Sequence, residues 1–176
     1  MRGLYVGRFQ PIHNGHLHCI KYALTKVEEL IVVIAASQYS HTIKNPFTAG
    51  ERYEMIFGSI KEAMLPIDKI HLIPAFDIND NSLWPYHLKR LVPSFEVAFS
   101  NNSFTTMLFE MAGVKVEHIP LLEREQYNAT KIREKIITDE PLDKLVPKYV
   151  ISFLKRINAK ERIMNAINSL DDPRKR

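Results

Sequence analysis

Cysteine is almost absent from the sequence. Cys19 is the only cysteine among 176 residues, which excludes an internal disulfide framework and a zinc site built from cysteine thiolates. Long hydrophobic runs are also lacking, because the longest, LIVVIAA at residues 30–36, is far shorter than the roughly 20 apolar residues of a membrane-spanning helix. The N-terminal apolar stretch is shorter still and is broken by glycine and arginine, unlike a secretory signal. These absences predict a cytoplasmic protein without a membrane segment.

Several functional signatures are missing as well. The chain contains neither a GxGxxG fingerprint nor a Walker lysine motif. It offers no convincing pair of carboxylates for general acid–base catalysis, which argues against a hydrolase. No zinc-finger spacing, basic–aromatic repeat or long basic run accompanies the net charge of +4, so we predict no nucleic-acid partner. A mild positive charge instead favours small anionic substrates.

Short apolar runs alternate with longer amphipathic ones along the whole chain, and this pattern is typical of an α/β domain with a parallel sheet. The expected strands cover residues 4–6, 29–37, 69–75, 95–100 and 114–119. The expected helices cover residues 15–27, 82–92 and 128–137 and the region from 147 onward. Thr48 and Glu51 form a possible capping box at the start of one further helix. Ser82 and Asn128 are candidate helix caps, and Pro85 fits only in a first turn.

We predict a doubly wound, Rossmann-like sheet of five parallel strands in the order 3-2-1-4-5. Residues 1–176 then form one domain, and residues 147–176 are a C-terminal helical extension of it. Ligands bind at the carboxyl ends of such strands, where the strand order reverses between the first and fourth strands. The segment that directly follows the first strand is therefore the expected binding site.

That segment reads GRFQPIHNGH at residues 7–16. Gly7 ends the first strand and permits a tight turn. His13 comes just before the expected helix and His16 falls in its first turn, so both can face one ligand. Gly15 leaves room for a flat group beside the backbone. Because a helix N-terminus suits an anion and no third metal ligand has the right spacing, phosphate is a better candidate ligand than a metal.

The same segment resembles the HxGH motif of the nucleotidyltransferase superfamily, and its wording is similar to that of the archaeal-type nicotinamide mononucleotide (NMN) adenylyltransferases. Three further stretches resemble that family in the same order: SHTIKNPFTAGER at 40–52, DINDNSLW at 77–84 and TKIR at 130–133. The similarity runs from Met1 to about residue 160. Its departures are Ala35, Asn101-Asn102-Ser103 and Asn128-Ala129, which replace glycine or serine patterns common in the family.

The resemblance implies a reaction: transfer of the adenylyl group of ATP to NMN, giving NAD and pyrophosphate. It implies Mg²⁺ held mainly by the ATP phosphates, no metal site of the protein itself, and a homo-oligomer such as a hexamer. The incoming NMN phosphate has a second pKa of about 6, so it is mostly dianionic at neutral pH and needs no general base. In-line attack on the α-phosphorus then requires only positioning and charge stabilisation.

The resemblance also implies roles for individual residues. His16 should stabilise charge at the α-phosphate, Trp84 should stack on the nicotinamide ring, and Asp77 should accept a hydrogen bond from NMN. The expected catalytic residues are His16, His13, Arg8 and Arg133. The expected ATP-binding residues are Gly7, Arg8, Phe9, Gln10, His13, Gly15, His16, Asn102, Thr130 and Arg133. The expected NMN-binding residues are Asp77, Ile78, Trp84 and Phe47.

Other interpretations stay open at this point. Another HxGH enzyme with a phosphopantetheine or FMN acceptor would carry the same histidines, and so would a non-catalytic nucleotide sensor on the same fold. Trp84 could be an ordinary packing residue, since tryptophan is large and amphipathic. Glu51 and Arg52 are predicted to be cap and surface residues only.

Overall fold

Five parallel strands form a single sheet in the computed structural model, which describes residues 1–120 and 127–169. The order is β3-β2-β1-β4-β5, so the predicted doubly wound arrangement is confirmed. The strands are β1 (Arg2–Gly7), β2 (Glu29–Ile34), β3 (Ile70–Pro74), β4 (Val97–Phe99) and β5 (Lys115–Glu117). β2 ends three residues earlier than expected, because Ala36 adopts a left-handed φ of 52°, which no strand can continue.

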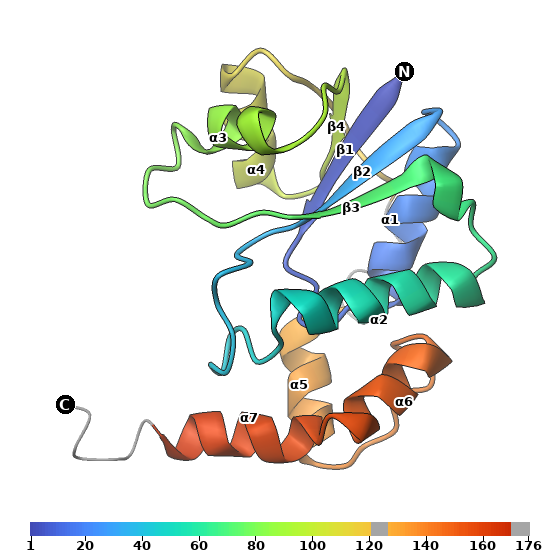
Figure 1. Cartoon of the computed structure of the whole chain (residues 1–176), viewed down its shortest axis with the longest axis vertical. Helices are drawn as coiled ribbons and strands as arrows, with labels where there is room; N and C mark the ends of the chain where they lie inside the picture. Colours follow the sequence, from blue (N-terminus) through green and yellow to red (C-terminus); the bar gives the residue numbers. More distant parts are fainter. Residues whose placement is uncertain (121–126, 170–176) are drawn as a thin grey trace.

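Helices cover both faces of this sheet (Figure 1). They are α1 (Asn14–Leu24), α2 (Ala49–Glu62), α3 (Trp84–Leu91), α4 (Ser103–Met111), α5 (Ala129–Ile137), α6 (Lys148–Arg156) and α7 (Ala159–Asn168), with a short 3₁₀ helix, η1 (Ile67–Lys69). Neighbouring residues of β1 point to opposite faces: Leu4 packs in one hydrophobic cluster with Leu88 of α3 and Phe109 of α4. Tyr5 packs in the other with Ile20 of α1 and other residues. The central strands are thus buried on both sides, as their apolar runs predict.

The C-terminal helices pack against α2 and α5 at the end of the molecule farthest from α3 and α4 (Figure 1). Phe153 of α6 and Ile163 of α7 are buried in the same hydrophobic cluster as Ile56 of α2 and Ile132 of α5. Helices therefore follow Pro147, as the sequence predicts. Within residues 1–120 and 127–169, no helix combines the length and apolarity that a membrane crossing needs.

Helix caps agree with the sequence at two places and differ at a third. Thr48 and Glu51 form the predicted capping box, and the Asn128 side chain accepts from the Thr130 N–H at 2.8 Å. The predicted Ser82 cap is wrong. α3 begins at Trp84 with Leu83 at the N-cap and no side-chain cap. Ser82 lies in a local turn before the helix, where its N–H and hydroxyl donate to Oδ1 of Asp80 at 2.9 and 2.6 Å.

Candidate active site

Two histidines form the N-terminal cap of α1. His13 is the N-cap and His16 is the third residue of the helix. The backbone N–H of His16 donates to Nδ1 of His13, and the backbone N–H of His13 donates to Nδ1 of His16, both at 3.2 Å. Their rings stack with centroids 3.6 Å apart. The predicted placement of both histidines is confirmed, and together they make a reciprocal capping box out of imidazoles.

This cap fixes the protonation of both rings. Because each Nδ1 accepts a hydrogen bond, the single ring proton of a neutral imidazole must lie on Nε2. Burial lowers the pKa of His13 to about 4. Burial and the neighbouring His13 hold the pKa of His16 well below its ordinary value. At neutral pH the pair therefore presents two uncharged Nε2–H donors.

Two cavities lie side by side at the carboxyl ends of β1 and β4. The first, of about 250 Å³, we call the histidine cavity; its lining includes His13, Gly15, His16, Asn102 and Tyr127. The second, of about 440 Å³, we call the tryptophan cavity; its lining includes Gly7, Arg8, Asp77, Ile78, Trp84 and Asn102. Asn102, the N-cap of α4, borders both. Of the predicted ATP residues, His13, Gly15 and His16 line the histidine cavity, whereas Gly7 and Arg8 line the tryptophan cavity with the predicted NMN residues Asp77, Ile78 and Trp84.

Trp84 and Asp77 lie against one another in the tryptophan cavity. The indole Nε1–H of Trp84 donates to Oδ1 of Asp77 over 3.4 Å, and the indole packs against the Phe109 ring with centroids 5.4 Å apart. Half-buried Trp84 therefore has one side in the core and another in the cavity. This position is compatible with a packing role for Trp84 and with stacking on the nicotinamide ring.

Three amide side chains hold the loops around the two cavities. Gln38 donates to the backbone carbonyl of Asp77 and accepts from its N–H, at 2.9 Å each. Gln10 makes the same pair of bonds to the Phe47 backbone, at 3.1 and 3.0 Å. Asn101 makes them to Ile119, at 2.8 and 2.9 Å. Each amide thus pairs with both the N–H and the carbonyl of one residue in another segment and thereby joins the two segments.

Three predicted site residues therefore support the site from behind. Gln10, Phe9 and Phe47 are 2%, 1% and 0% exposed. Phe9 packs beneath His16 with ring centroids 4.7 Å apart, and the Gln10 amide is used by the Phe47 backbone. The loop folds these three side chains inward, where they support the site, and substrate binding by these residues stays a prediction.

Gly15 has a different purpose from the one predicted. A Cβ atom at this position would lie 2.8 Å from Cβ of Tyr127 and 3.1 Å from the His13 ring. The expected room for a flat ligand group beside the backbone is thus taken by the protein's own side chains. Glycine is required here because Tyr127 and the His13 ring lie so close to the start of α1.

Arg133 connects α5 to the loop that follows β1. Its Nη1 donates to the carbonyl oxygen of Gln10 at 3.0 Å, and its Nη2 donates to Oγ1 of Thr130 at 3.1 Å. Burial lowers the pKa of the Arg133 guanidinium. Thr130 and Arg133 are thereby placed beside the histidine motif, as predicted. Arg8 is exposed and lines the tryptophan cavity.

Arg52 was not recognised from the sequence as part of the site. It is 0% exposed, so the prediction of a surface residue is wrong. Its guanidinium donates to backbone carbonyls of the loops that follow β1 and β2. An arginine in the first turn of an amphipathic helix resembles a solvated charge, and only the tertiary fold brings those carbonyls to it.

Metal binding has no dedicated protein ligands in the part of the chain that the structure describes. There, no group of three or more His, Cys, Asp or Glu side chains is placed to hold an ion. The two histidines of the motif each use Nδ1 for the backbone, which leaves one nitrogen apiece. This donor set suits phosphate oxygens, which accept hydrogen bonds, better than a cation.

Comparison with known sequences gives a consistent family. Residues 4–135 match the cytidylyltransferase-like family. The chain is 44% identical over 168 residues to a nicotinamide-nucleotide adenylyltransferase of Saccharolobus solfataricus, covering 96% of this chain and 98% of that protein. It is 43% identical to the protein of the same name from Thermococcus sibiricus, covering 97% and 92% of the two chains. The corresponding protein of Archaeoglobus fulgidus is 44% identical, with 93% and 95% covered.

Solved structures share the fold. A bifunctional NMN adenylyltransferase/ADP-ribose pyrophosphatase from Francisella tularensis, complexed with AMP and a manganese ion, superposes with a TM-score of 0.82 at 22% identity. The match covers 97% of this chain and 52% of that one, so the chain spans about half of that protein. A nicotinate-nucleotide adenylyltransferase structure from Vibrio parahaemolyticus gives a TM-score of 0.59 at 14% identity, covering 88% and 91%.

Proposed function

The chain belongs to the nicotinamide-nucleotide adenylyltransferases of the cytidylyltransferase-like family, and from this premise we propose how its residues carry out the reaction. The enzyme transfers the adenylyl group of ATP to NMN and releases NAD and pyrophosphate. Our proposal concerns where the two substrates bind, which groups stabilise the transition state, and why no base is required.

One observation carries the proposal: the reciprocal cap of His13 and His16. It leaves two Nε2–H donors at the start of α1, on the wall of the histidine cavity. We place the α-phosphate of ATP there. Such fixed donors stabilise charge that develops on the α-phosphoryl oxygens, because they need no reorganisation during the reaction.

NMN binds in the adjoining tryptophan cavity. The nicotinamide ring stacks on Trp84, and its carboxamide donates to Asp77, the carboxylate that lies against the indole. Arg8 lines the same cavity and is exposed, so its guanidinium is free to contact phosphate. The NMN phosphate then points toward Asn102, which borders both cavities.

The chemistry requires no deprotonation. The NMN phosphate is mostly dianionic at neutral pH, since its second pKa is about 6. One of its oxygens attacks the α-phosphorus in line, the bond to the bridging oxygen breaks, and pyrophosphate leaves with that electron pair. His13 and His16 are uncharged donors at neutral pH before the substrates bind, because burial lowers their pKa values.

Mg²⁺ bound together with ATP would supply further charge neutralisation at the departing pyrophosphate. Thr130 and Arg133, at the start of α5, hold the β- and γ-phosphates. The hydrogen bond from Arg133 Nη2 to Thr130 Oγ1 keeps the guanidinium and the hydroxyl side by side, so that both can contact the same phosphates. The Gln10 carbonyl anchors Arg133 from the other direction.

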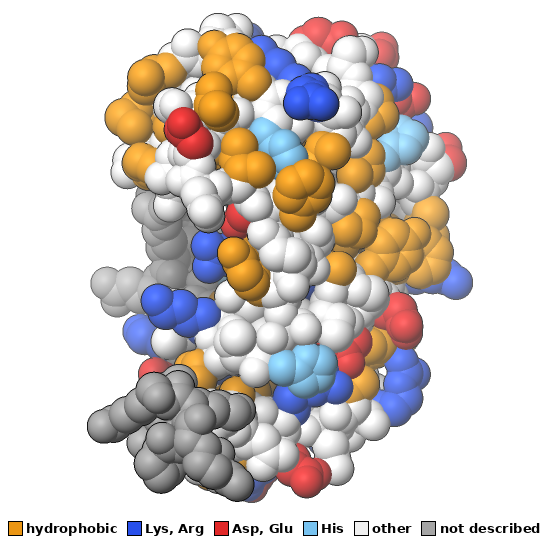
Figure 2. Space-filling view, turned by 60° about the vertical axis from the view of Figure 1, so that its left-hand side comes forward, with side chains coloured by type: hydrophobic (Ala, Val, Ile, Leu, Met, Phe, Trp, Pro, Cys, Tyr) orange, Lys and Arg blue, Asp and Glu red, His pale blue; other side chains and the backbone are white. Residues whose placement is uncertain are grey.

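We also propose a cytoplasmic homo-oligomer. Hydrophobic side chains gather on the upper part of the face shown in Figure 2. Exposed large apolar residues of α3, α4 and their flanks include Leu83, Tyr86, Leu91, Phe104, Met107 and Met111. Contact between copies would remove this surface from water. Light scattering after size exclusion measures the number of subunits, for which a hexamer is our prediction.

A panel of three candidate acceptors tests which molecule receives the adenylyl group. Purified protein is incubated with ATP and Mg²⁺ together with NMN, phosphopantetheine or FMN in separate reactions. We expect pyrophosphate release with NMN, accompanied by an equal amount of NAD. A product formed only with phosphopantetheine or FMN would favour the other HxGH enzymes, and ATP binding without any product would favour a nucleotide sensor.

A further inference from the structure

Arg52 is a fully buried cation whose hydrogen bonds all go to backbone carbonyls. Within residues 1–120 and 127–169, its guanidinium bonds to no carboxylate. Burial lowers the pKa of Arg52 to about 10, so the group stays charged at neutral pH. Burying a charge is costly unless hydrogen bonds compensate it, and a residue of this kind requires an explanation.

The four carbonyls belong to three separate segments. Nη1 donates to the carbonyl of Arg8 at 2.9 Å and to that of Ala35 at 2.7 Å. Nη2 donates to the carbonyl of Ala36 at 3.1 Å, and Nε donates to that of Thr48 at 3.3 Å. One planar group thus ties together the loop after β1, the loop after β2 and the cap of α2.

Two of these partners belong to the site. Arg8 and Ala35 both line the tryptophan cavity, and Arg8 begins the segment that leads to His13. The left-handed φ of Ala36, 52°, is part of the turn that presents its carbonyl to Arg52. The charge of Arg52 also lies close enough to Arg8 and Asp77 for both to influence its pKa.

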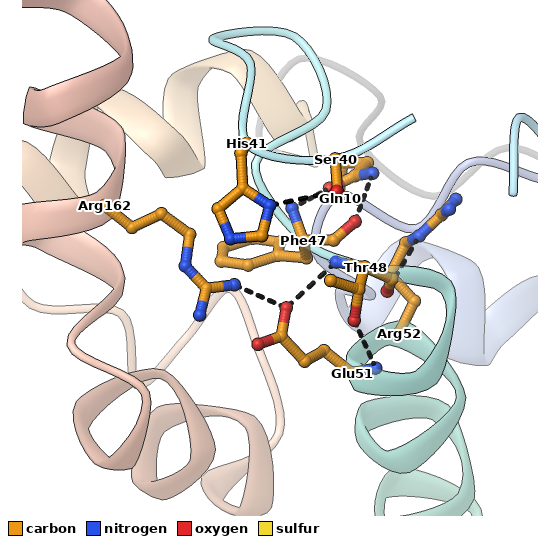
Figure 3. A network of polar contacts seen from close by, with 8 residues as sticks. All are labelled: Gln10, Ser40, His41, Phe47, Thr48, Glu51, Arg52 and Arg162. Atoms are coloured by element: carbon orange, nitrogen blue, oxygen red, sulfur yellow. Dashed lines mark hydrogen bonds and ion pairs between the residues drawn. The ribbon is translucent and has the colours of Figure 1, made fainter. Parts of the chain in front are cut away.

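Arg52 also donates from Nε to the Thr48 carbonyl, at a helix cap that neighbouring contacts hold in place (Figure 3). Glu51, its neighbour in α2, accepts from the Thr48 N–H at 2.9 Å and from Arg162 of α7 at 2.5 Å. The Gln10 amide fixes the adjacent Phe47 backbone. Arg52 is thus joined, through the Thr48 cap and Glu51, to a hydrogen-bond network that reaches α7.

We propose that Arg52 is a positioning residue for adenylyl transfer: it fixes the carbonyl of Arg8, and through it the loop that carries His13, against the ends of β2 and α2. This inference rests on the proposed function. Arginine is needed because its rigid fork reaches carbonyls in several directions at once, whereas the ammonium of lysine is a single point of charge.

The test compares Arg52→Lys with two controls. Arg2→Lys alters an arginine at the opposite end of β1, which bonds Glu29 at 2.7 Å and the Ser94 carbonyl at 3.1 Å. Ile56→Val removes a buried methyl group from α2, the helix that carries Arg52, and leaves a small cavity. It serves as a control for any loss of thermal stability in Arg52→Lys. Each protein is assayed for kcat, for KM of ATP and NMN, and for amide hydrogen exchange, below the temperature at which it unfolds.

We expect Arg52→Lys to lower kcat by about 10- to 100-fold, since a displacement near 1 Å at a catalytic group can cost about 100-fold. Its KM values should change by less than about threefold, because the binding groups themselves remain. Amide exchange should accelerate in residues 8–13 and not at the Arg2 end of the sheet. Both controls should keep the wild-type kcat.

Three outcomes would overturn the proposal. A folded Arg52→Lys protein with wild-type kcat shows that the charge alone suffices. An equal fall of kcat in Ile56→Val assigns the effect to stability. Failure of Arg52→Lys to fold assigns Arg52 to the fold and not to positioning. If the wild-type protein makes no NAD, the proposed function fails, and faster exchange in residues 8–13 still decides whether Arg52 holds the loop.

Discussion

His13 and His16 each donate a backbone N–H to the other's Nδ1, at 3.2 Å in both directions. In the same chain, α2 is capped by the same reciprocal arrangement with a threonine and a glutamate, Thr48 and Glu51, at 3.1 and 2.9 Å. Helix capping alone therefore requires only an oxygen acceptor. The imidazoles of α1 add what oxygen acceptors lack, an Nε2–H on the far side of each ring, and we assign that donor to the phosphate.

Substitution of His13 can separate its role as helix cap from its role as hydrogen-bond donor to phosphate. Asparagine is a favourable N-cap, whereas alanine at an N-cap costs about 0.5–2 kcal/mol of stability. We expect His13→Asn to keep more of the free energy of unfolding than His13→Ala, while both lose kcat to a similar degree. Urea unfolding and NAD formation measure the two effects. Retention of wild-type kcat by His13→Asn would show that His13 serves only as a cap.

Stability should depend on pH through the same pair. The folded pKa of His13, about 4, lies below its ordinary value of 6.5, so between these values the unfolded chain binds a proton that the folded chain does not. The free energy of unfolding contributed by His13 is then complete above pH 6.5 and falls as the pH drops toward 4. The lowered pKa of His16 acts in the same direction.

Urea unfolding at pH 7.5, 6.5, 5.5 and 4.5 measures this dependence. His13→Asn should reduce the slope between pH 6.5 and 4.5. His41→Asn removes an exposed histidine and should keep the wild-type slope. Equal slopes for the wild type and His13→Asn would contradict the assignment of an uncharged His13.

Trp84 tests the NMN site. Stacking of a base on an aromatic side chain is worth about 1–3 kcal/mol, so Trp84→Ala should raise KM for NMN by about tenfold or more. Trp84→Phe keeps an aromatic ring, so its KM for NMN should lie between those of the wild type and Trp84→Ala. KM for ATP should stay constant, because ATP binds in the histidine cavity. A rise in KM for ATP, with NMN unaffected, would show that the two substrates are assigned to the wrong cavities.

Much of the fold follows from local sequence patterns. The buried strands, the position of His13 before α1, and the caps at Thr48 and Asn128 depend on residues that lie within a few positions of each other. Local signals of this kind are readable along a chain. The neighbours β3-β2-β1 and β4-β5 follow from connections between consecutive strands, and the pairing of β1 with β4 follows from the doubly wound pattern.

The remaining features depend on contacts between distant segments. Arg52 resembles a surface charge because its carbonyl partners lie 44, 17 and 16 residues away. Phe47 resembles a substrate contact because nothing local shows that Gln10 draws its backbone inward. Ser82 resembles a cap until Asp80 takes both of its donors. In each case a tertiary or competing hydrogen bond decides, and such bonds have no periodic signature.

The most direct measurement is the rate of NAD formation from ATP, Mg²⁺ and NMN by the wild type and by His16→Ala. The account predicts a fall in kcat of about 10²–10³-fold, the usual effect of removing one oxyanion-type donor. Circular dichroism should show that the variant is folded, and His41→Ala should remain as active as the wild type. NAD formation by folded His16→Ala at the wild-type rate would contradict the account.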